Sequence, residues 1–308
     1  KLRMANFVAD DFTFTEVAGE LSIKDGISAF SKLTAKAMGG SVVGRASFDL
    51  NIFPPSYEVE IDLLDCEAEE LKRQIDIDTY FLNGKLNGRI KITGKFDDAN
   101  PTMLITGHLK MTARENDILT YAEADITYRL HHLTLSNIYG REPANGTVNA
   151  NLEILFEKGS TRIIGTVGLQ DVGIHTLARI GKADPEWLDG HVTGNSELRL
   201  CFGKGMVIED CLTNGIITSS SFTVFGVPIT GAANFTFDGD RLTVRDFVGQ
   251  SCGGSVKGMF YTENAGSRVE VAGEKVRLAE VLKALKLGNE LSGDTTFTTA
   301  FETKTNVP

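Results

Sequence analysis

Hydrophobic and polar residues alternate along most of this chain. The alternation is clear in residues 46–52, 57–63, 103–111 and 148–156. Successive side chains of a strand point to opposite faces, so this period of two predicts β-strands with one apolar and one polar face. Turn-forming sequences such as Lys24-Asp25-Gly26 separate the segments. Because the links are tight, we expect a mostly antiparallel sheet.

Three short segments have a helical pattern instead. They are residues 65–75, 171–180 and 277–287. In the third segment, apolar residues recur at i, i+3, i+4 and i+7 from Leu278, which is the clearest amphipathic pattern of the three. Each segment is long enough for about three helical turns. We therefore expect three short helices in a chain that is otherwise β.

Two glycine landmarks recur in the same order along the chain. A glycine that opens a strand follows each predicted helix, and its successive positions are 106 and 103 residues apart: Gly84, Gly190 and Gly293. A second glycine-rich strand start precedes each helix, with spacings of 102 and 112 residues: Gly44, Gly146 and Gly258. A recurrent period of about 105 residues predicts repeated structural modules.

This period divides the chain into three expected β repeats. The first spans residues 1–115 with a helix near 65–75, the second spans 116–225 with a helix near 171–180, and the third, truncated, spans 226–308 with a helix near 277–287. The predicted fold is mainly β: an extended, curved, mostly antiparallel sheet, in the form of a β-groove or an open barrel or sandwich. A sheet of this many strands has to curl or split.

Composition narrows the classes of function. The 308 residues are 42% hydrophobic and 23% charged, and the net charge is −10. That charge argues against a nucleic-acid partner, since phosphate binding needs a concentrated basic surface. No apolar stretch is long enough for a transmembrane helix. The chain begins Lys-Leu-Arg and ends within a strand-like pattern, so we expect it to be part of a longer protein.

Cysteine and histidine spacing predicts no metal site. Cys66, Cys201, Cys211 and Cys252 form no Cys-x-x-Cys pair. A hairpin centred on residues 203–205 would bring Cys201 near Cys211, so a disulfide there is one hypothesis. His131 and His132 are adjacent in a strand pattern and therefore point to opposite faces. We expect no metal and no cofactor.

No catalytic motif stands out either. The chain has no Gly-x-Ser-x-Gly elbow, and its glycine-rich segments lack the Lys-Ser/Thr ending of a phosphate-binding loop. Acidic pairs such as Asp97-Asp98 lie in predicted turns. We therefore expect that the protein is not an enzyme.

What remains is the apolar face of the predicted strands. Such a face forms the core of a sandwich when two sheets meet, and the pattern by itself favours this interpretation. The alternative is a curved sheet whose inner face stays open as a hydrophobic trough. An exposed continuous apolar surface is typical of a site that binds an apolar ligand or a protein partner.

The third repeat carries a resemblance that favours the trough. Its Gly-Gly-Ser-Val-Lys-Gly strand start (253–258), its Leu-Ala-Glu-Val-Leu-Lys-Ala-Leu helix (278–285) and its Leu-Ser-Gly strand start (291–293) resemble the C-terminal region of AsmA-like proteins of bacterial envelopes. Residues 21–26, which lead to Gly39-Gly40, are similar to the strands upstream in that family. The resemblance covers the whole chain loosely and residues 235–301 best.

The resemblance implies a location and a function. AsmA-like proteins usually have an N-terminal inner-membrane anchor, with the remainder in the periplasm. They are thought to form long β-sheet grooves with apolar interiors and to help move phospholipids between the membranes or maintain the outer membrane. By this resemblance, the partners are a phospholipid or other acyl-chain lipid and envelope proteins, and the anchor would lie outside this chain.

The family has no catalytic residues to transfer, so the groove itself is the candidate site. The candidates are apolar residues of the predicted strands: Phe48, Leu50, Ile90, Ile92, Ile105, Leu109, Leu152, Ile154, Val167, Leu198, Leu200, Phe235, Phe237 and Phe260. One rival hypothesis is a structural or scaffolding envelope protein with a closed core and no ligand. Another is a polymer-binding β-protein, which one tryptophan and six tyrosines make weaker.

Overall fold

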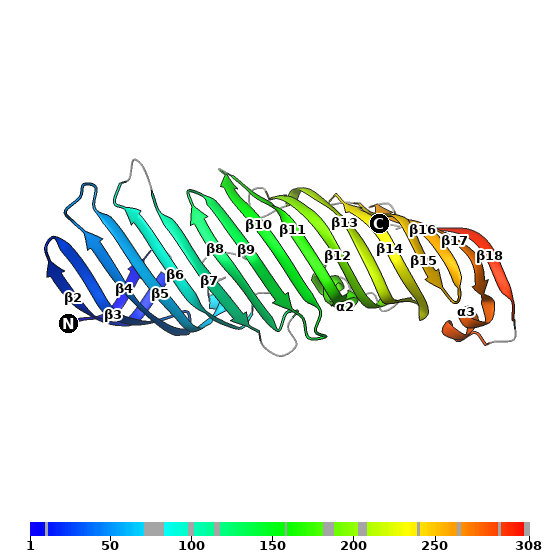
Figure 1. Cartoon of the computed structure of the whole chain (residues 1–308), viewed down its shortest axis with the longest axis horizontal. Helices are drawn as coiled ribbons and strands as arrows, with labels where there is room; N and C mark the ends of the chain where they lie inside the picture. The colour runs from blue at the N-terminus through cyan, green and yellow to red at the C-terminus, as the bar shows by residue number, and fades with distance from the viewer. Residues whose placement is uncertain are drawn as a thin grey trace. The chain divides into compact units, whose positions relative to one another are not determined.

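β-strands dominate the structure, a computed structural model of the chain. It describes residues 1–9, 12–70, 83–97, 102–113, 118–157, 159–180, 188–202, 208–238, 241–263, 266–288 and 291–304. The strands of these residues form one open antiparallel sheet of eighteen strands (Figure 1). The predicted mainly β, curved antiparallel sheet is therefore confirmed.

The strands follow one another along the chain as a meander. The first ten are β1 (Leu2–Ala9), β2 (Phe12–Lys24), β3 (Ile27–Ala37), β4 (Gly40–Asp49), β5 (Ser56–Glu67), β6 (Lys85–Lys95), β7 (Leu104–Thr112), β8 (Tyr121–Arg129), β9 (His132–Arg141) and β10 (Thr147–Glu157). The others are β11 (Ser160–Gly173), β12 (Leu188–Phe202), β13 (Ile208–Val224), β14 (Val227–Phe237), β15 (Leu242–Ser251), β16 (Gly254–Glu263), β17 (Gly266–Arg277) and β18 (Asp294–Lys304).

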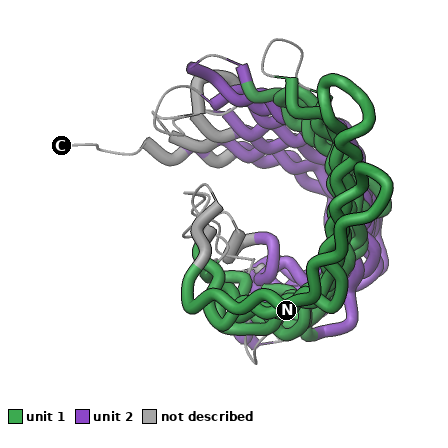
Figure 2. Tube along the Cα trace, turned by 90° about the vertical axis from the view of Figure 1, so that its left-hand side faces the viewer, with its two compact units in different colours: residues 1–143, 151–156 green, residues 144–150, 157–308 purple. Residues whose placement is uncertain are grey.

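The chain divides into two compact units. Unit 1 comprises Lys1–Pro143 and Asn151–Phe156, and unit 2 comprises Ala144–Ala150 and Glu157–Pro308. Within each unit the strands bend into an arc, as the tube drawing shows (Figure 2). The boundaries of the three predicted repeats are not those of the two units, and the division into repeats stays a prediction.

A β-bulge precedes each predicted helix. It interrupts the pairing register of β5 between Leu63 and Cys66, and equivalent breaks occur in β11 and β17. The bulged residues have a left-handed backbone with φ near 54°: Asp65 (54°), Asp171 (53°) and Lys275 (55°). The next residue points inward and is almost inaccessible: Cys66 (0% exposed), Val172 (0%) and Val276 (2%). A β-bulge bends its strand and changes the direction of the side chains that follow. The same local structure therefore redirects the chain before each of the three predicted helices.

The repeated glycines have a shared backbone reason. Gly84, Gly190 and Gly293 have φ values of 133°, 115° and 127°, which residues with a Cβ rarely adopt. Gly84 and Gly293 directly precede β6 and β18, and Gly190 is the third residue of β12. The landmark seen in the sequence therefore marks the backbone change that leads into the strand after each helical segment.

The helices are shorter than predicted. α2 spans Ile174–Ile180 and α3 spans Leu278–Ala284. Residues 171–173 and Arg277, expected at their starts, are the last residues of β11 and β17 because the bulged strands continue to that point. In the first predicted helix, residues 65–67 are the last residues of β5, residues 68–70 are helical, and residues 71–75 lie outside the described residues.

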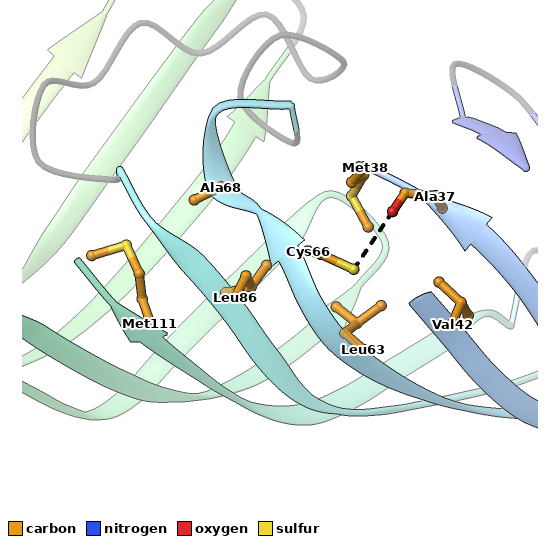
Figure 3. Packing of buried hydrophobic residues seen from close by; sticks show 8 residues of the cluster. All are labelled: Ala37, Met38, Val42, Leu63, Cys66, Ala68, Leu86 and Met111. Carbon is orange, nitrogen blue, oxygen red and sulfur yellow. Dashed lines mark hydrogen bonds between the residues drawn. The ribbon is translucent and has the colours of Figure 1, made fainter. Parts of the chain in front are cut away.

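Two buried apolar clusters lie where the strands approach the helical segments. In unit 1, Cys66 and Leu63 pack among the buried side chains shown in Figure 3: Ala37, Met38, Val42, Ala68, Leu86 and Met111. In unit 2, Cys252, Val256 and Val276 pack with Val281 of α3 and with Phe297. These clusters make one end of the strands the best-packed part of each unit.

Strand β4 ends earlier than the alternation predicted. The pattern in residues 46–52 predicted a strand, but β4 stops at Asp49, and Leu50 and Ile52 lie in the loop that leads to β5. Pro54 and Pro55 follow, and proline has no N–H to donate to a strand ladder. The loop is fastened instead by the Asn51 side chain, which donates to the Asp25 carbonyl at 2.8 Å.

The four cysteines are free thiols. In the β12–β13 ladder, Cys201 lies opposite Asp210, and Cys211 lies opposite Leu200. Neighbouring positions on a strand face opposite sides of the sheet, so the two sulfur atoms lie on different faces. The hypothesis of a Cys201–Cys211 disulfide is therefore wrong.

Candidate functional site: the apolar faces

One face of unit 1 is apolar across seven consecutive strands. Two cross-strand rows run from β3 to β9 through paired positions: Leu33, Gly44, Ile61, Ile90, Gly107, Ile126 and Leu135 form one, and Phe30, Ala46, Val59, Ile92, Ile105, Tyr128 and Leu133 form the other. We call this surface the apolar face of unit 1. Both rows consist only of apolar residues, glycine and one tyrosine, so the Tyr128 hydroxyl is the one polar side-chain group in them.

Unit 2 has a similar apolar face from β11 to β17. Paired positions form a row of Val167, Ser196, Gly215, Phe235, Val244, Phe260 and Val269. A neighbouring row contains Gly165, Leu198, Thr213, Phe237 and Leu242. This face carries Ser196 and Thr213, so it is less uniformly apolar than that of unit 1.

Large side chains on these faces lie flat across glycines of the neighbouring strand. A Cβ built on Gly215 would come within 2.6 Å of the Phe235 ring, and one on Gly94 would come within 2.5 Å of the Tyr57 hydroxyl. The ring therefore occupies the space that a neighbouring side chain would fill. Phe235 and Tyr57 therefore cover the backbone of the strand next to their own.

The candidate groove residues in strands are partly exposed. Phe48, Ile90, Ile92, Ile105 and Leu109 lie on the apolar face of unit 1, and none of them is fully buried. Val167, Leu198, Leu200, Phe235, Phe237 and Phe260 share the apolar face of unit 2 with the same partial exposure. In a closed sandwich core such residues would be buried.

Three candidates need separate placement. Leu152 and Ile154 are partly exposed residues of β10, and the ring contact of Tyr128 with Phe156 two residues later places that side of β10 on the apolar face. Leu50 lies in the loop after β4 and is 56% exposed. The structure thus brings thirteen candidates onto strand faces and leaves Leu50 at the end of a strand.

The opposite face of unit 1 is charged. Arg45 pairs with Glu60 at 2.8 Å, Lys91 with Glu58 at 2.9 Å, and Arg89 with Asp62 at 2.6 Å. Hydrogen bonds from Arg89 hold the pKa of Asp62 below its usual range. Each exposed pair contributes little to stability. Together the pairs make this face of the sheet polar and hydrated, in contrast to the apolar face on its other side.

A second polar cluster follows on β7 and β8 of the same charged face. His108 Nδ1 lies 2.7 Å from Asp125, whose pKa is lowered by hydrogen bonds from Asn137 and His108. Tyr121 donates to Glu123, and this bond raises the pKa of Tyr121 to about 12. Within the described part of the chain, the side chains that contact the His108 imidazole in this cluster are the carboxylates of Asp125 and Glu123. Among the described residues no group of three or more His, Cys, Asp or Glu side chains is placed to hold a metal ion.

The sequence reasoning missed an aromatic cluster in unit 1. It lies at the end of the sheet where hairpins join β2 to β3, β4 to β5, β6 to β7 and β8 to β9, which we call the hairpin edge. The Phe96 ring stacks on Phe48 with centroids 6.0 Å apart and tilts against Tyr57 at 5.0 Å. Phe30 meets Phe48 edge-on at 5.9 Å. Phe96 follows the end of β6, so no alternation marked it.

Two recesses adjoin this cluster. The one on the apolar face has a volume of about 460 Å³ and is lined by Phe48, Tyr57, Lys95, Phe96, Asp97, Thr102 and Met103. The one on the charged face has a volume of about 630 Å³, and its wall includes Tyr57, Lys95 and Thr102 again, with Ser47, Asp49, Glu58, Thr93, Leu104 and Arg129 among the others. The three shared residues place the recesses side by side around the hairpin edge.

No protein-family model, curated protein or solved structure matches the chain. No helix within the described ranges has the length and apolarity to cross a membrane.

Proposed function

We propose that this chain is a non-enzymatic lipid-binding protein whose apolar faces hold acyl chains. In this proposal it is an AsmA-like envelope protein. It works in the bacterial periplasm, tethered to the inner membrane by a segment outside this chain, and takes part in phospholipid transfer for the outer membrane. Envelope proteins would be its macromolecular partners, and lipid binding would need no cofactor.

The observation that carries the proposal is the partly exposed apolar face of unit 1. A monomeric soluble protein rarely leaves a large apolar surface in contact with water. The two rows from β3 to β9 contain no charged group, and apart from the buried Ala46 their residues are only partly covered. An acyl chain laid on this face would remove both surfaces from water.

The binding energy of an acyl chain on this face favours movement of the lipid along the face over tight binding at one position. Each buried CH₂ group contributes about 0.8 kcal/mol. The contacts of Ile90, Ile92 and Ile105 are chemically alike, so a chain that shifts from one to the next exchanges equal contacts. A polar anchor within the rows would oppose such sliding, and the rows contain none apart from the Tyr128 hydroxyl.

The motif resemblance supports the same assignment. The strand start at 253–258 opens β16, the helical segment is α3, and Gly293 opens β18. The elements expected from AsmA-like proteins thus occur in the expected order. Location and transport rest on this resemblance, whereas lipid binding rests on the apolar face.

The test is lipid capture by the purified chain. We expect native mass spectrometry to detect bound phospholipid in protein purified from a bacterial host. The Ile92→Asp/Leu109→Asp variant places two carboxylates on the apolar face and should lose at least about 90% of the lipid, because burying a charge beside an acyl chain is unfavourable. Circular dichroism checks that the β-sheet survives.

The matched control is Thr106→Asp/Thr134→Asp. These residues alternate with apolar-face positions, so they lie on the charged face of β7 and β9. This variant should retain wild-type lipid occupancy. A wild-type chain that stays lipid-free after incubation with phospholipid vesicles would favour the structural, scaffolding alternative.

A further inference from the structure

We propose that the hairpin edge of unit 1 is the site at which the headgroup and first chain segment of an anionic amphiphile bind. The ligand class is an acyl-chain lipid with a phosphate headgroup. The inference rests on the proposed function and deepens it, because it assigns the polar end of the ligand to particular residues. The site consists of the aromatic cluster and the two recesses beside it.

The aromatic cluster fits the apolar part of such a ligand. Phe96 is 56% exposed although it stacks on Phe48 and Tyr57, so one side of its ring is open to the smaller recess. Its backbone is fixed, since the Phe96 N–H donates to the Pro55 carbonyl at 2.9 Å. Met103 adds a flexible thioether to the same recess. A saturated chain would pack against a preformed surface.

The larger recess fits the polar part. Lys95 and Arg129 line it, and neither makes an ion pair or side-chain hydrogen bond with any described residue. Of the two carboxylates in the same wall, Glu58 forms an ion pair with Lys91 at 2.9 Å, and Asp49, which keeps its negative charge, accepts from the Asn51 N–H at 2.9 Å. Two cations without an ion-pair partner among the described residues, Lys95 and Arg129, therefore face one unpaired carboxylate in this wall, and this excess of positive charge favours an anionic headgroup.

The two parts are connected through their shared wall. Lys95 and Tyr57 line both recesses, and the Tyr57 hydroxyl has no hydrogen-bond partner among the described residues. The Tyr57 ring contacts Phe96 on the apolar face. One amphiphile can therefore touch the rings with its chain and reach the Lys95 ammonium and Tyr57 hydroxyl with its phosphate. This arrangement would position a lipid for entry onto the rows of the apolar face.

Calorimetric titration of the whole chain tests the assignment with three probes below their micelle-forming concentrations. The probes are dodecyl phosphate, dodecyl maltoside with the same chain and an uncharged head, and inorganic phosphate. Lys95→Gln should weaken dodecyl phosphate binding about fivefold and leave dodecyl maltoside unchanged, since only the charge-assisted contact is lost. Phe96→Ala should weaken both detergents about tenfold, because it removes the ring that the chain contacts.

Lys110→Gln is the matched control, because it also removes a lysine of the charged face but one that pairs with Glu123 at 3.6 Å outside both recesses. It should bind like the wild type. If dodecyl phosphate binds Lys95→Gln and Phe96→Ala as well as it binds the wild type, this site is wrong while lipid binding elsewhere stands. If neither detergent binds the wild type, the proposed function fails as well. Saturable binding of inorganic phosphate alone would reassign the recess to a free anion.

Discussion

The two ends of the strands in unit 1 differ in packing although one alternating pattern runs through both. At the end joined by the 68–70 helical segment, which we call the helix edge, Leu63, Cys66 and Leu86 are buried within one cluster (Figure 3). At the hairpin edge, Phe53 is 97% exposed and Phe96 is 56% exposed. The helix edge is therefore the better-packed end of the strands, and the hairpin edge leaves apolar rings in contact with solvent.

The connections explain this difference. At the helix edge, the bulge at Asp65 re-aims β5 so that Cys66 and Ala68 pack over the sheet. At the hairpin edge, a loop with two prolines follows β4, and its apolar residues have no such layer to pack against. The connections thus determine which edge of the sheet is packed and which edge keeps apolar residues exposed.

The largest effect should come from the helix edge. Leu63 is 6% exposed and packs in the buried cluster. Leu63→Ala should lower the free energy of unfolding by about 2–5 kcal/mol, because it removes apolar contacts and leaves a cavity. Urea denaturation followed by circular dichroism measures the change. A loss below about 1 kcal/mol would mean that this edge is packed as loosely as the hairpin edge.

Cysteine reactivity should separate the packed positions from the open ones. Burial raises the pKa of the Cys66 thiol, and Cys66 is fully inaccessible, whereas Cys201 is partly exposed. Because the thiolate is the reactive form, Ellman's reagent at pH 8 should modify Cys201 more than about tenfold faster than Cys66. Single-cysteine variants that retain only one of the two thiols assign the rates. Equal rates would contradict a closed cluster around Cys66.

The smallest effect should come from the hairpin edge. Phe53→Ser removes a ring that is 97% exposed, so the free energy of unfolding should change by less than about 0.5 kcal/mol. The same urea titration measures it beside Leu63→Ala. A destabilisation above about 1 kcal/mol would show that the loop packs against the sheet and that its exposure is not a binding feature.

Much of the architecture was predictable from local sequence. The alternation in residues 57–63 and 148–156 identified β5 and β10, and the glycines at 84, 190 and 293 marked strand starts whose backbone only glycine adopts readily. The later two helices were found because their apolar spacing is local. The first helix lies largely outside the described residues, and the repeat boundaries stay a prediction.

Other features depended on contacts that a linear pattern does not contain. Leu50 continued the alternation of β4, yet Pro54 and Pro55 and the Asn51–Asp25 hydrogen bond favour a loop there. Cys201 and Cys211 looked close in a hairpin, but the register places them on opposite faces. Phe96 joins the aromatic cluster only because β4, β5 and β6 are paired.

The sequence by itself determined which residues form strands and that each strand has one apolar face, because side-chain alternation is a property of the extended backbone. Only the tertiary structure decided how far each apolar face is covered. Coverage depends on where bulges re-aim strands and on which side chains lie across glycines of a neighbouring strand, as Phe235 does over Gly215. Those contacts join residues distant in the chain, so they follow from register and curvature and not from local pattern.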